Sequence, residues 1–133
     1  MKLETNWKSV QASQTDIFAF LSDMNNLQKL MPEQVGNWTS DTDTCQFTIK
    51  GMADLGMKIT GRTPESLIAI ASHGKSPFPF TLDIHIKVAG DVSEAQLSFN
   101  GEVNPFLKMM VEKPLGNFFN MLLDGLSKQF ASV

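Results

Sequence analysis

Residues 104–131 read NPFLKMMVEKPLGNFFNMLLDGLSKQFA, and this stretch decides the fold. It opens with Asn104 and Pro105; asparagine is a good N-cap, and proline suits the first helical position. Apolar side chains then recur at helical spacing as far as Leu126. A long amphipathic helix that follows a series of strand-like segments predicts a sheet packed against one helix. The space between the two is either a solid core or a pocket for an apolar molecule.

Pro114 lies inside the helical pattern, where it removes one backbone hydrogen bond. At about 100° per residue, the apolar side chains before and after the proline do not share one direction. The two sets are Phe106, Leu107, Met109 and Met110 before it, and Leu115, Phe118, Phe119, Leu122 and Leu126 after it. We therefore expect a bend or break within one turn of Pro114, with both halves burying their stripes against the same sheet.

Alternating apolar and polar residues precede this helix in several short segments, which predicts strands. The clearest are residues 44–50 and 78–88, and a further strand is expected at residues 2–10. Ser13 starts a short helix as its N-cap, while Asp23 and Asn26 close the turn into a second one. Turns separate the later strands, which favours an antiparallel meander.

Length and composition narrow the function classes. The chain has 133 residues, enough for a single domain over residues 1–133. Its net charge is −3 with no basic block, which argues against nucleic acid as the main partner. The first residues lack the apolar region of a signal peptide, and no apolar run approaches the roughly 20 residues of a transmembrane span. We expect a cytoplasmic protein.

The segment SQTDIFAFLSDMNNLQKLM at residues 13–31 resembles the opening pattern of the START-like (SRPBCC) superfamily, with Asp23, Asn26 and Pro32 at the usual places. The resemblance implies the α+β helix-grip fold, in which a curved antiparallel sheet of six to seven strands surrounds a long C-terminal helix and two short helices follow the first strand. The chain is most similar to the compact bacterial members, which are like either polyketide cyclases or the G-type accessory protein of carbon monoxide dehydrogenase. These motifs imply a fold rather than an activity.

The expected inner face of the sheet carries no acidic or basic side chain. Its members are Cys45, Phe47, Ile49, Leu55, Met57, Ile59, Phe80, Leu82, Ile84, Leu97, Phe99 and Val103. A general acid or base needs an ionisable group within reach of the substrate, and this face offers none. No cysteine–histidine cluster and no nucleotide-binding glycine motif is present, so we expect no metal and no cofactor. This favours a binder of a small hydrophobic or amphipathic ligand, without catalysis.

Two alternatives stay open. The first is a small enzyme of the polyketide cyclase/dehydratase type, whose weak catalytic candidate is His73, because a turn residue can overhang a cavity mouth. His85 alternates with Asp83 and Lys87 and is expected on the solvent side. The second alternative is a protein-interaction module with a filled core.

The ligand of such a binder is expected between the sheet and the final helix. Methionine suits such a site because its side chain is flexible and polarisable. The residues predicted to touch the ligand point inward on strands or lie on the expected apolar face of the helix. They are Met57, Phe80, Phe99, Phe106, Met110 and Phe118.

Overall fold

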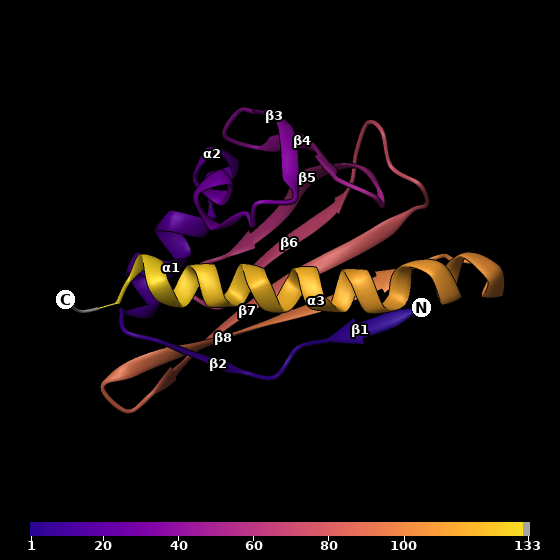
Figure 1. Ribbon diagram of the computed structural model, residues 1–133. Coiled ribbons are helices and arrows are strands. Elements are labelled where there is room, and N and C mark those ends of the chain that lie inside the picture. Colours follow the sequence, from indigo (N-terminus) through magenta and orange to yellow (C-terminus); the bar gives the residue numbers. More distant parts are fainter. Residues whose placement is uncertain (132–133) are drawn as a thin grey trace.

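The computed structural model describes residues 1–131 and has an α+β architecture (Figure 1). Its helices and strands follow one another in an order that places one long helix after a series of strands. They are β1 (Lys2–Glu4), β2 (Lys8–Val10), α1 (Gln14–Leu21), α2 (Met24–Leu27), the 3₁₀ turn η1 (Gln28–Leu30), β3 (Val35–Ser40), β4 (Thr44–Ile49), β5 (Ala53–Thr63), β6 (Leu67–Ser72), β7 (Phe80–Ala89), β8 (Val92–Gly101) and α3 (Pro105–Gln129).

The strands form one antiparallel sheet, and α3 lies along one of its faces (Figure 1). The strand order is β1-β8-β7-β6-β5-β4-β3, and β2 also pairs with β8. Residues 1–131 thus contain eight strands rather than six or seven, because the predicted opening strand is split around Thr5. The Thr5 hydroxyl accepts a hydrogen bond from the backbone N–H of Leu97 at 3.0 Å. The predicted helix-grip fold is confirmed.

The two short helices begin as the sequence predicts. The Ser13 hydroxyl accepts from the Asp16 N–H at 3.1 Å, and the Asp23 carboxylate accepts from the Asn25 N–H at 2.9 Å. Asn26 donates from its side-chain amide to the Phe20 carbonyl at 3.1 Å, which closes the turn between the helices. These short-range bonds carry the chain across the open end of the sheet.

Helix α3 begins at its predicted cap, where the Asn104 side chain accepts from the Leu107 N–H at 2.8 Å. It continues unbroken through Pro114, so the predicted interruption is wrong. The predicted stripe left out Val111, which is buried and continues the spacing of four residues from Leu107 to Leu115. One stripe therefore faces the sheet along the whole helix, and Pro114 itself is exposed.

Aromatic side chains fill the space between the sheet and the middle of α3. Phe118 stacks on Phe47 with ring centroids 5.9 Å apart, and Phe119 packs on Phe99 at 5.2 Å. Phe99 in turn contacts Phe80 at 5.3 Å. The core is thus closed at this level by interlocking rings.

Candidate functional site

A small cavity lies between the sheet and the C-terminal half of α3. Its volume is about 20 Å³, enough for one water molecule. Only leucine and isoleucine line it, so it holds no ionisable group. The lining residues are Leu21, Leu27, Leu30, Ile70, Leu82, Ile84, Leu97, Leu122, Leu123 and Leu126.

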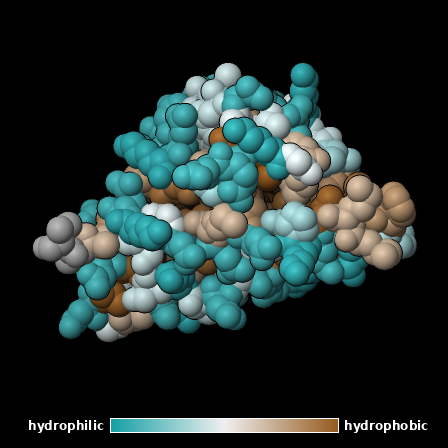
Figure 2. Space-filling model, viewed as in Figure 1, coloured by the Kyte–Doolittle hydropathy of each residue, from teal (hydrophilic) through white to brown (hydrophobic). Residues whose placement is uncertain are grey.

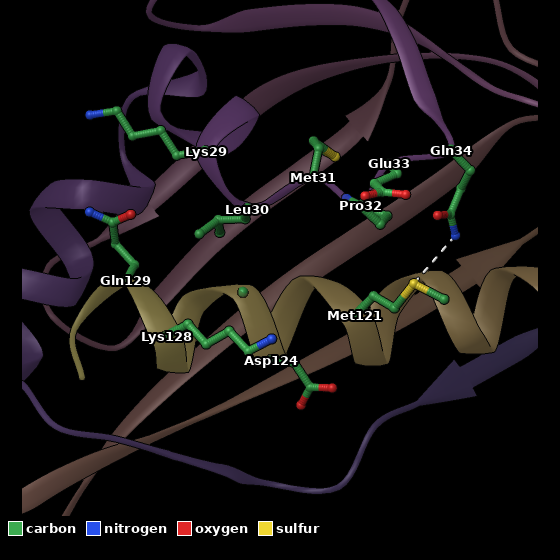
Figure 3. Close-up of a pocket in the computed structure, with 11 residues that line it drawn as sticks. Lys29, Leu30, Met31, Pro32, Glu33, Gln34, Met121, Asp124, Lys128 and Gln129 are labelled. Carbon is green, nitrogen blue, oxygen red and sulfur yellow. Dashed lines mark hydrogen bonds between the residues drawn. The ribbon is translucent and has the colours of Figure 1, made fainter.

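A larger groove of about 590 Å³ lies on the outside of the same part of α3 (Figure 3). One wall is the segment that follows α2, and the other is the outer side of α3. The lining residues are Lys29, Leu30, Met31, Pro32, Glu33, Gln34, Met121, Asp124, Gly125, Lys128 and Gln129. Leu30 lines both the cavity and the groove, so its side chain forms part of the wall between them.

Leu30 rests directly on α3 because residue 125 is glycine. A Cβ at Gly125 would lie 2.8 Å from the Leu30 carbonyl oxygen and 3.2 Å from its Cα, which is too close for backbone atoms. Further along, the Gln34 side-chain amide donates to the Met121 sulfur at 3.3 Å (Figure 3). The wall between cavity and groove therefore depends on a close approach that only glycine permits.

Charges around the groove are unevenly distributed. Asp124 is paired with Lys8 at 3.2 Å, on the side of α3 that faces β2. The Lys29 ammonium lies 5.8 Å from the centre of the Phe20 ring and points away from α3 (Figure 3). Lys128 lies on α3 at the Leu30 end of the groove, whereas Glu33 lies toward the Gln34 end (Figure 3). The Leu30 end is therefore the more cationic one.

The structure separates the six residues predicted to touch a ligand. The four that are buried in the core between the sheet and α3 are Met57, Phe80, Phe99 and Phe118. Phe106 and Met110 are 75% and 59% exposed, and Met109 beside them is 84% exposed. Because Leu107 and Val111 take the inward positions, these neighbours turn to solvent. None of the six lines the leucine-rich cavity.

His73 does not overhang that cavity. Its carbonyl covers Gly56 on the side of β5 that Gln46 shares, opposite the inward Leu55 and Met57. His73 is exposed there, so its predicted position at the cavity mouth is wrong. His85 also lies on the outer face, half-buried against the Trp7 ring.

Two groups in this part of the sheet have shifted pKa values. The backbone N–H of Thr44, 2.7 Å from the Asp41 carboxylate, and the Thr44 hydroxyl are the main causes that lower the pKa of Asp41. Burial raises the pKa of the Cys45 thiol to about 12, as expected for a core cysteine. Neither shift creates a reactive group near the leucine-rich cavity.

The pairing of Leu30 with Gly125 was not predicted from the sequence. The available signal was the glycine itself, since a glycine inside a helical pattern lowers helix stability and points to a close packing contact. Its partner is 95 positions away in the chain, so the pattern did not indicate what packs there.

Within residues 1–131, no group of three histidine, cysteine, aspartate or glutamate side chains is placed to hold a metal ion. The same residues contain no helix of the length and apolar character that crossing a bilayer requires.

Comparison with known proteins identifies the architecture. The sequence matches no protein-family model, and no curated protein matches it. Among solved structures, a START superfamily protein from Mycobacterium smegmatis superposes with a TM-score of 0.76 at 15% identity, over 97% of this chain and 96% of that one. The chain has the START-like fold.

Other solved structures share this START-like fold at similarly low identity. An uncharacterised protein from Bacillus thuringiensis has a TM-score of 0.75 at 10% identity, covering 98% of both chains. The protein XoxI from Bacillus cereus has a TM-score of 0.74 at 12% identity, covering 97% of this chain and 94% of that one. At these identities the likeness concerns the fold.

Proposed function

We propose that this protein binds a small apolar or amphipathic molecule between the sheet and the C-terminal half of α3. The observation that carries the proposal is the cavity without ionisable groups, which shares Leu30 with an open groove. An apolar space next to a polar, open one matches the usual composition of small-molecule sites. The likeness to a START superfamily protein is consistent with it.

Binding requires the cavity to enlarge. At about 20 Å³ it is much smaller than any apolar ligand, so Leu30 or its neighbours must move to admit one. A ligand that buries about 300 Å² of apolar surface gains about 7 kcal/mol. Association and rearrangement offset several kcal/mol of that gain. We therefore expect micromolar or weaker affinity.

The test uses N-phenyl-1-naphthylamine, an uncharged apolar probe whose fluorescence rises on binding. Leu123→Phe enlarges a buried side chain that lines the cavity, and it should abolish the fluorescence gain. Val88→Phe is the matched control, because Val88 is 63% exposed at the far end of β7. No binding by the wild type, together with no small molecule retained in native mass spectrometry, would refute the proposal.

A protein-interaction module is the second candidate. Three large apolar side chains are exposed together at the start of α3, namely Phe106, Met109 and Met110 (Figure 2). Exposed apolar patches of this kind often mark contact sites between proteins. Self-association is the version that purified protein can test: light scattering should show a concentration-dependent mass that Met109→Glu removes.

A further inference from the structure

We infer that the ligand is a single-chain amphiphile with a carboxylate head, which enters through the groove past Leu30 and leaves its head beside Lys128. This inference rests on the proposed function and adds the route and the ligand class. Its three supports are the weak attachment of the Leu30 segment, the chemistry of the cavity wall and the charges of the groove.

The Leu30 segment is attached mainly at its two ends. Leu30 ends a single 3₁₀ turn, a form with poorer hydrogen-bond geometry than an α-helix. Beyond it, the segment is fixed to the sheet at Gln34, whose carbonyl accepts from the Lys50 N–H at 2.8 Å. Between these points it touches α3 through the Leu30–Gly125 contact. Segments held by packing rather than by backbone bonds open at low free-energy cost.

The cavity wall selects the tail. Every lining side chain is leucine or isoleucine, so a polar group placed there would lose its hydrogen bonds to water without replacement. The inserted part of the ligand must therefore be purely hydrocarbon. An unbranched alkyl chain suits the entrance, because it needs only Leu30 to move aside.

The groove selects the head. Four charged side chains line it: Lys29, Glu33, Asp124 and Lys128. Asp124 is neutralised by Lys8, and Glu33 lies at the end away from Leu30. A head left beside Leu30 meets the Lys128 ammonium, with Lys29 exposed on the opposite wall (Figure 3). A carboxylate gains a charge-assisted hydrogen bond there, and a cationic head does not.

The first experiment compares three ligands with the same tail by calorimetry: dodecanoate, dodecanol and dodecyltrimethylammonium. Dodecanoate should bind the wild type at least threefold more tightly than the other two. Lys128→Gln should remove that preference, while Lys75→Gln, on an exposed turn outside the groove, should keep it. Equal affinities for the three heads in the wild type would overturn the assignment of the head.

The second experiment tests the route by stopped-flow mixing with dodecanoate. Gly125→Ala places a methyl group against the Leu30 backbone and should raise the association rate severalfold. Gly116→Ala is the matched control on the same helix, since a Cβ there meets nothing within 4 Å. Should Gly125→Ala fail to fold, Leu30→Ala tests the same route by removing the side chain, again with a faster association.

The outcomes separate the two proposals. If the uncharged probe binds and Leu123→Phe blocks it, but the Leu30 and Gly125 variants leave the association rate unchanged, the ligand enters elsewhere and this inference fails alone. If the wild type binds neither the uncharged probe nor any dodecyl compound, the proposed function fails with it.

Discussion

The two halves of α3 differ sharply although they form one continuous helix. The part before Pro114 buries one side chain completely, Val111, and exposes two methionines and Phe106. The part after Pro114 buries a further six apolar side chains against the sheet. Figure 1 shows why: the first turns of α3 extend past β1, where no strand lies beneath them. Burial along this helix thus depends on how far the sheet reaches, and apolar composition alone does not predict it.

The largest contrast should come from removing one phenylalanine from each half. Phe118→Ala deletes a ring that is 2% exposed and stacked on Phe47, so it should lower the free energy of unfolding by about 3–5 kcal/mol. Phe106→Ala should change it by less than about 0.5 kcal/mol, because that ring is exposed. Urea denaturation measures both. Similar losses would mean that the start of α3 is covered in solution.

Gly125→Ala should have the next largest effect. The added methyl group meets the Leu30 backbone, and we expect a loss of about 1–3 kcal/mol in the free energy of unfolding. Gly116→Ala should instead stabilise by about 0.5–1 kcal/mol, because alanine favours the helix and nothing obstructs it. Thermal melts of the pair give opposite signs if Leu30 packs on α3 as described. Equal signs would show that the contact yields easily.

Pro114→Ala should stabilise the protein by on the order of 1 kcal/mol. Alanine restores the backbone donor that proline lacks, and the residue is exposed, so no packing is lost. The gain stays below the roughly 3 kcal/mol helix preference because proline also restricts the unfolded chain. Chemical denaturation measures the change, with Lys113→Ala as a neighbouring exposed control. A loss of stability would indicate that the proline shapes the helix.

Met109→Glu should have the smallest effect on stability, within about 0.5 kcal/mol, because the side chain it replaces is 84% exposed. The same variant tests the interaction candidate, so its melting temperature and its mass in solution should be measured together. A large drop in melting temperature at low concentration would contradict the exposed position of Met109.

Features set by nearby residues were predictable from the sequence. The alternation in β4 and β7, the Ser13 and Asn104 caps and the Asp23–Asn26 turn depend on short-range spacing, and all were confirmed. Val111 shows the limit even for a single helix, since the inward stripe was identified only after the sheet placed it.

Features set by distant residues were not predictable. The exposure of Phe106 depends on where the sheet ends, and the cavity volume depends on how rings from four strands and α3 interlock. The contact between Leu30 and Gly125 joins segments that share no sequence pattern. An inner face without charge was the correct indication, but its composition is the same whether the space is open or filled.

The pairing of β1 with β8 has a consequence for synthesis on the ribosome. Leu3 leaves the ribosome among the first residues, yet its partner Phe99 is made near the end of the chain. At about 5–20 residues per second, β1 waits on the order of 5–20 s without its neighbour, whereas β3 to β8 pair with strands made just before them. The nascent protein therefore holds a meander with an open edge at β8 until the amino terminus returns to close it.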